Sequence, residues 1–156
     1  MKTSRRRFVA TLGTVAAGTA ANAQRPGRIA GFDHVALPMR NTDAMLAFYR
    51  ALGCQMTETT AVVSVHVSAD QMINFHRPTL WQNATFTLKA PAATPPCGDL
   101  CFVWDGTAAA LQTLLDGAKA TVIEGPVSRQ GGRRATGSSV YVRDPDGNLI
   151  EFIIYG

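Results

Sequence analysis

Two stretches of the chain place apolar residues at helical spacing. The apolar positions follow an i, i+3, i+4 pattern in both and are Met45, Phe48 and Tyr49 in the first stretch and Leu111, Leu114 and Leu115 in the second. Each stretch ends at a glycine, Gly53 or Gly117, a residue that commonly terminates helices. The pattern predicts two short amphipathic helices, one in each half of the chain.

Shorter apolar or alternating runs surround these helices and are typical of β-strands. They lie at residues 31–39, 55–60, 62–68 and 72–78 around the first helix and at 99–104, 120–127, 139–143 and 148–154 around the second. Each half therefore has the predicted order strand, helix, strand, strand, strand.

The two halves also align with each other residue by residue. An offset of 66 superimposes the two helices, and an offset of 77 aligns residues 63–76 with 140–153 without a gap, because the run SRQGGRRATG lengthens the second half. We therefore expect an α+β fold of two tandem βαβββ modules, residues 30–78 and 98–156. The proline-rich segment 79–97 is predicted to link them.

Positive charge is concentrated at the start of the chain. The net charge of +4 equals the four basic residues of segment 1–23, so the remainder is close to neutral, which argues against nucleic-acid binding. This segment combines a basic start, a short apolar stretch and Ala21-Asn22-Ala23, as export signals do, and its SRRRF run resembles a twin-arginine signal. We expect export to the periplasm or beyond in a bacterial cell, with no stable membrane span after processing. A Sec signal or an amphipathic anchor is the alternative.

The three cysteines, Cys54, Cys97 and Cys101, cannot all pair with one another. A Cys97–Cys101 disulfide would close a very short loop, and three free thiols are the simpler interpretation.

Glu151 stands among five large apolar residues in the run 149–154. An ionised carboxylate taken out of water is costly unless a cation or a hydrogen-bond donor pairs with it. The offset of 77 aligns Asn74 with Glu151, and the offset of 66 aligns His34 with Leu100. If the modules pack about a pseudo-twofold axis, these four positions converge on one cavity, where Glu151 would face a metal ion or protonated His34.

The duplicated plan, the runs FDHVAL and AFYRALG, and above all VYVRDPDGNLIEF resemble the vicinal oxygen chelate superfamily. This superfamily includes glyoxalase I, extradiol dioxygenases, fosfomycin-resistance transferases and bleomycin-binding proteins. The resemblance covers about residues 30–156. It implies an open, U-shaped mixed sheet, a half-barrel around a cavity, with modules that pair within one chain or across a homodimer.

The resemblance further implies that His34 and Glu151 bind a divalent transition metal such as Zn, Ni, Fe or Mn, and that acid–base work falls to Glu151 or a bound water. Relatives commonly supply further ligands at the positions of Leu100 and Asn74. Leucine cannot ligate a metal, and a carboxamide oxygen is a weak ligand for a transition metal. His76, two residues beyond Asn74, is a possible third ligand, the alternative being a residue at the rim of the cavity.

Four further residues are candidates for contacts with a substrate: Tyr141, Arg143, His66 and Trp81. Arg143 could equally brace the turn at Asp144, His66 could face solvent, and Trp81 could simply pack. The run with Arg129, Arg133 and Arg134 is either a mobile lid or a solvated loop.

These expectations define a leading function and two alternatives. The first is a metal-dependent lyase, isomerase or dioxygenase of the glyoxalase type, acting on a small oxygen-rich molecule. The second is a metal-free protein that binds and sequesters a small molecule, which the leucine at position 100 favours. The third is a partner-binding module with a vestigial cavity.

Overall fold

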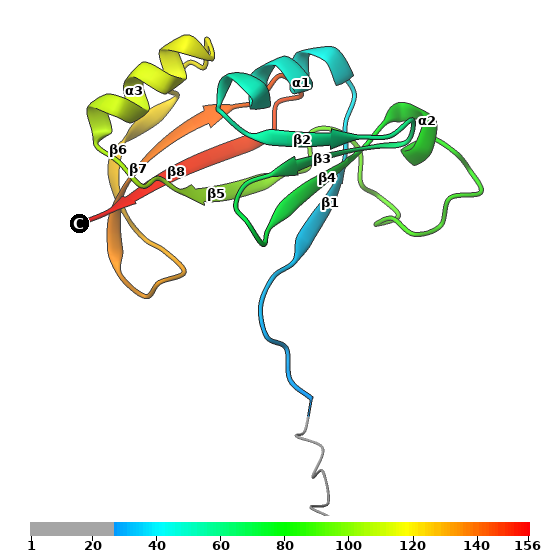
Figure 1. Cartoon of the computed structure of the whole chain (residues 1–156), viewed down its shortest axis with the longest axis horizontal. Coiled ribbons are helices and arrows are strands. Elements are labelled where there is room, and N and C mark those ends of the chain that lie inside the picture. The colour runs from blue at the N-terminus through cyan, green and yellow to red at the C-terminus, as the bar shows by residue number, and fades with distance from the viewer. Residues whose placement is uncertain (1–26) are drawn as a thin grey trace, which may run out of the picture. The chain divides into compact units, whose positions relative to one another are not determined.

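The computed structural model describes residues 27–156, so the export signal expected at residues 1–23 lies outside the described part of the chain. Residues 31–156 form one compact unit (Figure 1). None of the helices in the described range is long and apolar enough to cross a membrane.

The first module contains β1 (His34–Pro38), α1 (Thr42–Ala51), β2 (Gln55–Glu58), β3 (Val62–His66) and β4 (Met72–His76). The second contains β5 (Asp99–Val103), α3 (Ala108–Gly117), β6 (Glu124–Gln130), β7 (Thr136–Arg143) and β8 (Leu149–Tyr155). The predicted βαβββ repeat is therefore confirmed. Between the modules, a short helix α2 (Pro78–Trp81) begins the segment that had been expected to be a plain linker.

Each module builds one four-stranded mixed sheet, with strand order β1-β4-β3-β2 in the first and β5-β8-β7-β6 in the second. The strands that come first and last along each module, β1 with β4 and β5 with β8, are neighbours and run parallel. The remaining neighbouring pairs run antiparallel. The sheets are open and do not close into a barrel.

The prediction placed the strand β6 too early, at residues 120–127. It begins at Glu124 and continues to Gln130, so residues 128–130 of the Gly- and Arg-rich run pair with β7, and residues 136–137 belong to β7 itself. Only residues 131–135 connect the two strands. Most of the expected long loop is thus an extension of the β-hairpin. The sequence did not indicate this extension, because its paired residues are polar and show no apolar alternation.

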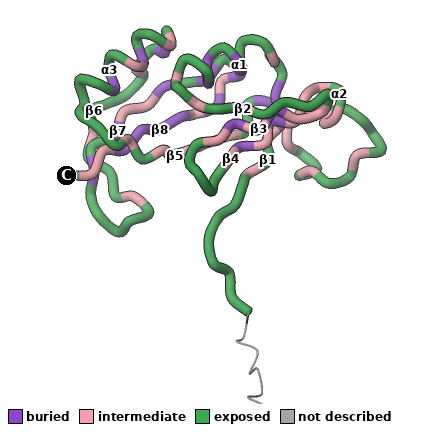
Figure 2. The backbone as a smooth tube through the Cα atoms, in the orientation of Figure 1, coloured by how far each residue is buried: buried purple, intermediate pink, exposed green. Residues whose placement is uncertain are grey.

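One face of each sheet is covered by a helix, and both of these faces contribute to a single hydrophobic core (Figure 2). The first module contributes Tyr49 and Phe75, among others, to this core, and the second contributes residues such as Leu111, Ile150 and Phe152. We call the opposite, helix-free face of each sheet its cup face. The cup face of the first sheet carries His34, Asn74 and His76 at alternate positions, and that of the second carries Asp99, Glu151 and Tyr141.

The turn from Arg143 to Leu149 joins the modules. Asp146 Oδ2 accepts a hydrogen bond from the Arg40 backbone nitrogen at 2.6 Å, and Oδ1 accepts one from the Asn41 nitrogen at 2.9 Å, just before α1 begins. The neighbouring Asp144 accepts a hydrogen bond from the Tyr49 hydroxyl at 3.2 Å. The acids of the RDPDGN run therefore hold the helix α1 of the other module, Asp146 at its start and Asp144 near its end.

Candidate functional site

Strand β5 turns a different residue toward its cup face than the sequence alignment implied. In the parallel pairs, His34 lies beside Met72 and Asp99 lies beside Leu149, and Met72 and Leu149 are equivalent in the two modules. The residue equivalent to His34 is therefore Asp99. Leu100 is partly buried against the hydrophobic core on the opposite face. The inference that leucine occupies the usual ligand position is wrong, because the spacing between β5 and α3 is one residue longer than that between β1 and α1.

Glu151 lies half-buried on the cup face of β8, next to Cys101 of β5 and Tyr141 of β7. The Ser139 hydroxyl donates a hydrogen bond of 2.5 Å to Glu151 Oε1. Burial, reinforced by the neighbouring Glu151 carboxylate, raises the pKa of the Cys101 thiol to about 11. The partner that the carboxylate requires is thus, in this chain, a serine hydroxyl, and a cation would have to approach from the cavity.

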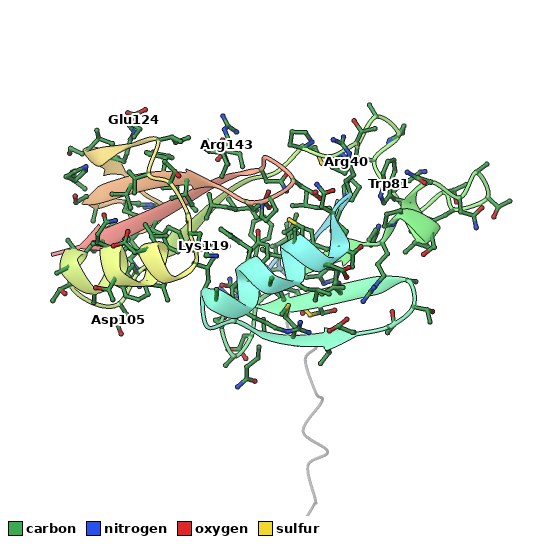
Figure 3. All side chains as sticks on the ribbon, turned by 90° about the horizontal axis from the view of Figure 1, so that it is seen from above. Arg40, Trp81, Asp105, Lys119, Glu124 and Arg143 are labelled. Atoms are coloured by element: carbon green, nitrogen blue, oxygen red, sulfur yellow. The ribbon has the colours of Figure 1, made fainter. Side chains whose placement is uncertain are left out.

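Glu151, Tyr141 and Arg143 line one cavity of about 440 Å³, together with Asp99 and Arg129. Arg129 Nε donates to the Tyr141 hydroxyl at 3.1 Å, and its guanidinium also pairs with Glu124 at 2.8 Å. Figure 3 shows Glu124 and Arg143 on the side of the second sheet that faces away from α3. Three of the predicted site residues are therefore brought together by β7 and β8.

His34 lies at the beginning of β1 and does not share the cavity of Glu151. Its Nδ1 is 2.6 Å from Asp33 Oδ1, and its side chain is 46% exposed. His34 lines a second, larger cavity of about 630 Å³ that also reaches Asp99 and Cys101. Asp99 borders both cavities and so links the surroundings of His34 to those of Glu151.

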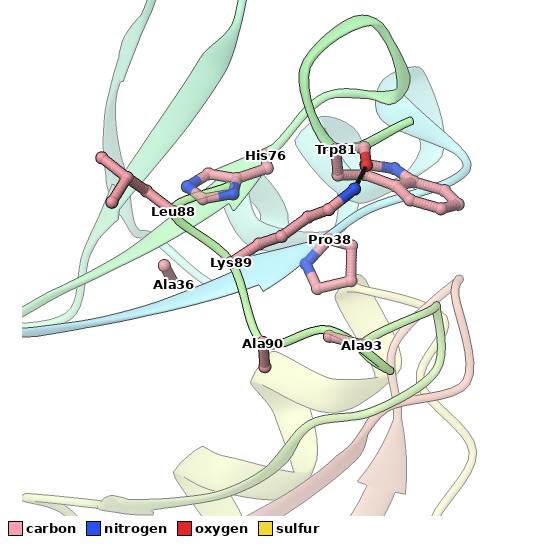
Figure 4. A pocket seen from close by; sticks show the side chains of 8 residues that line it. All are labelled: Ala36, Pro38, His76, Trp81, Leu88, Lys89, Ala90 and Ala93. Atoms are coloured by element: carbon pink, nitrogen blue, oxygen red, sulfur yellow. Dashed lines mark hydrogen bonds between the residues drawn. The ribbon is translucent and has the colours of Figure 1, made fainter. Parts of the chain in front are cut away.

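His76 and Trp81 line a third cavity, of about 280 Å³, beneath the connecting segment (Figure 4). The ring of His76 lies edge-on to Phe86, and burial lowers the pKa of His76. Trp81 Nε1 donates to the Met39 carbonyl at 2.8 Å, and Lys89 donates to the Trp81 carbonyl. Most of the residues that line this cavity are apolar, and His76 and Lys89 contribute an imidazole and an ammonium group to it.

Two predicted residues have other neighbours in the structure. Asn74 Oδ1 accepts a hydrogen bond of 2.6 Å from the Ser64 hydroxyl. His66 Nε2 lies 3.5 Å from Thr57 Oγ1, and His66 lines shallow cavities beside the β3–β4 turn. Neither residue borders the cavity of Glu151.

Among residues 27–156, no group of three or more His, Cys, Asp or Glu side chains is arranged to hold a metal ion. A His and two acids are available on the cup faces, but within one chain Asp99 shares one cavity with His34 and another with Glu151, and neither of these cavities holds all three.

Sequence reasoning missed Asp99, Ser139 and the role of Arg129 beside Tyr141. A signal for Asp99 was present in the strand itself. Leu100, Phe102 and Trp104 form the bulkier apolar face of β5, which marks the side that packs on the helix and leaves Asp99 on the other side.

Comparison with known proteins identifies the family. The model of the glyoxalase/bleomycin resistance protein/dioxygenase superfamily matches residues 31–152. The chain is 34% identical over 134 residues to glyoxalase domain-containing protein RDO1 of Mycosarcoma maydis, covering 85% of this chain and 72% of that protein. It is likewise 34% identical over 126 residues to virulence protein STM3117 of Salmonella typhimurium, covering 79% and 83% of the two chains.

Solved structures agree with this assignment. The integron cassette protein VCH_CASS1 of V. cholerae superimposes with a TM-score of 0.73 at 30% identity, over 85% of this chain and all of the other. The crystal structure of STM3117 gives a TM-score of 0.72, also at 30% identity, over 83% of this chain and all of the other. A lactoylglutathione lyase from Agrobacterium tumefaciens shares the fold, with a TM-score of 0.61 at 24% identity, over 80% of this chain and 93% of the other. The chain therefore belongs to the glyoxalase/bleomycin resistance protein/dioxygenase superfamily.

Proposed function

We propose that this protein is a divalent-metal-dependent enzyme of the glyoxalase type, which acts as a lyase, isomerase or dioxygenase on a small oxygen-rich molecule. The observation that carries the proposal is the register of β5. It puts Asp99 at the position equivalent to His34, where the alignment places a leucine, so the cup faces carry three side chains of a kind that can ligate a metal, His34, Asp99 and Glu151.

The chemistry of these donors suits a divalent transition metal. One imidazole and two carboxylates form a mixed nitrogen and oxygen set of the kind that binds Fe(II), Mn, Ni or Zn. The hydrogen bond between Asp33 and His34 Nδ1 would orient the ring and leave Nε2 as the ligating nitrogen. Asn74 is the weaker candidate for a fourth position, because its amide oxygen already accepts from Ser64. His76 is a candidate only if its ring leaves Phe86.

A metal bound to these residues would polarise adjacent oxygens of a substrate and stabilise the negative charge that develops on them. The chain's own residues do the remaining work. Ser139 fixes Glu151 Oε1 and so aims the carboxylate, while Arg129 fixes the hydroxyl of Tyr141 beside it. In this arrangement Glu151 is the group on the cup face of β8 that holds or moves a proton at the substrate.

The proposed site needs the cup face of a first module to meet the cup face of a second. The outer edges of β1 and β5 are both unpaired within their sheets. Two copies of the chain could pair through these edges, because an unpaired strand edge presents free backbone donors and acceptors. We therefore propose a homodimer in which His34 of one chain faces Asp99 and Glu151 of the other.

The test is the metal content of the protein, purified without chelator, beside that of Asp99→Asn and Glu151→Gln. Retention of metal by the parent, with loss in both variants, is the expected result. Ile154→Ala, which alters the core face of β8, is the matched control and should keep its metal. A parent that stays metal-free after incubation with Fe(II), Mn, Ni and Zn would refute the proposal.

The dispersal of the donors within one chain favours a second candidate, a metal-free protein that sequesters a small molecule. In that case ligands would raise the melting temperature of the metal-free protein. The enzyme proposal predicts that such protection requires metal.

A further inference from the structure

We propose that Arg143 forms a carboxylate-binding subsite, so that the substrate carries one carboxylate in addition to the oxygens that bind the metal. This inference rests on the proposed function for the position of the metal. It adds a substrate class that neither the fold nor the family description specifies.

The charges around the 440 Å³ cavity lead to this proposal. Its charged residues are Asp99, Glu124, Arg129, Arg143 and Glu151. Glu124 and Arg129 form an ion pair and balance each other. A divalent cation would balance Asp99 and Glu151. The guanidinium of Arg143 then remains as one uncompensated positive charge in the cavity, which favours a singly charged anion.

Arg143 is held so that it can receive such a group. Its Nη1 donates a hydrogen bond of 2.9 Å to the Gly147 carbonyl, and among the described residues no acid lies within ion-pair distance of it. The hydrogen bond to Gly147 confirms that Arg143 braces the turn, as the alternative interpretation had it. It also limits the conformations of the side chain and leaves other guanidinium donors for a ligand, and a planar guanidinium binds a carboxylate through two parallel hydrogen bonds.

The strand register sets the length of the substrate. Asp99, Leu149 and Arg143 lie in one row across β5, β8 and β7. Neighbouring strands are about 4.8 Å apart, so the backbones of Asp99 and Arg143 are separated by about 10 Å. An aromatic ring, or a chain of a few carbons, would place vicinal oxygens at a metal held by Asp99 and Glu151 and a carboxylate at Arg143.

The experiment compares two ligands of nearly equal size, 3,4-dihydroxybenzoate and the neutral 3,4-dihydroxybenzamide. Their dissociation constants for the metal-loaded full chain are measured by calorimetry. The benzoate should bind about tenfold more tightly, as expected for a charge-assisted bidentate contact. Arg143→Gln should abolish this preference and Arg143→Lys should retain part of it. The control is Arg134→Gln, on the β6–β7 connection, which should leave the preference unchanged.

A second background separates this proposal from the proposed function. In Asp99→Asn/Glu151→Gln the two carboxylates are neutral without a metal, so Arg143 should still prefer benzoate to benzamide in that protein. If the parent holds no metal while this variant shows an Arg143-dependent preference, the enzyme proposal fails and the subsite stands. Equal binding of each ligand pair, no detectable binding in either background, or a preference that survives Arg143→Gln would overturn the subsite.

Discussion

Individual carboxylates in the last 13 residues have different tasks, although they stand close together in the sequence. Asp144 and Asp146 are buried and accept hydrogen bonds from the first module, whereas Glu151 is half-buried on a cup face. The difference follows from position: the two aspartates lie in the turn that contacts α1, and Glu151 lies five residues beyond Asp146, in β8.

Asp146→Ala should lower the free energy of unfolding by about 2 kcal/mol or more, because the backbone N–H groups of Arg40 and Asn41 would lose their acceptor in a partly buried place. Urea unfolding measures the change. Asp116→Ala removes an exposed aspartate of α3 and is the control, expected to cost less than about 0.5 kcal/mol. Equal effects of the two substitutions would contradict the role of Asp146.

The lowered pKa of His76 predicts a pH dependence of stability. The unfolded chain titrates near the ordinary value of 6.5, so at pH below this value it binds more protons than the folded protein. The free energy of unfolding should therefore fall as the pH drops through about 6.5 toward the lowered pKa of the folded state. Unfolding of the wild type and of His76→Gln between pH 5 and 8 checks this. The variant should lose this part of the pH dependence, whereas His66→Gln should keep it.

At the scale of elements, the helices and the order of helix and strands along each module could be predicted from the sequence, but the register and the length of β6 could not. The helix positions followed from their apolar spacing, and α1 and α3 do lie 66 residues apart. The same offset failed for β5, where a one-residue change in a connection moves every side chain to the other face. In β6 exposed polar residues are paired, so no apolar alternation marks its end. The residues of the candidate site were thus predictable on β8 and β1 but not on β5.

The hairpin of β6 and β7 supplies a prediction at this scale. A Cβ atom at Gly137 would lie 2.6 Å from Ile153 Cγ1 and 2.7 Å from the Ile154 carbonyl oxygen. Gly137→Ala should therefore lower the free energy of unfolding by about 1–3 kcal/mol, because β7 and β8 would have to separate locally. Gly132→Ala, in the connection of the same hairpin, meets nothing within 4 Å and should be close to neutral. Chemical denaturation of the two variants checks the difference.

At the scale of the whole molecule, the described chain shares one core between its modules but divides its polar residues between two cup faces. The core faces of both sheets are covered by packing within the chain, so the cup faces are the faces that a ligand or another chain can contact. This arrangement explains why His34 and Glu151 line different cavities although the sequence repeat places both on strands next to a cup.

Mixing two variants that are each expected to lose the metal tests the proposed dimer. His34→Ala and Glu151→Gln should each lose the metal. After joint unfolding and refolding, half of the dimers combine both variants, and one of their two cups then has both intact halves. The mixture should recover about a quarter of the parental metal content. Cups completed within one chain would give no recovery, and dimerisation alone is followed by sedimentation.

The turn that joins the modules has a consequence for how sequences of this kind are interpreted. RDPDGN is part of the run that carried most of the resemblance to the family in the sequence, yet its acids connect the two halves of a duplicated scaffold. A match to this run therefore reports the assembly of the chain and carries little information about its reaction. Relatives with the same joint can differ in chemistry, and the residues that distinguish them should be sought on the first strand of each module, where this chain has a histidine and an aspartate.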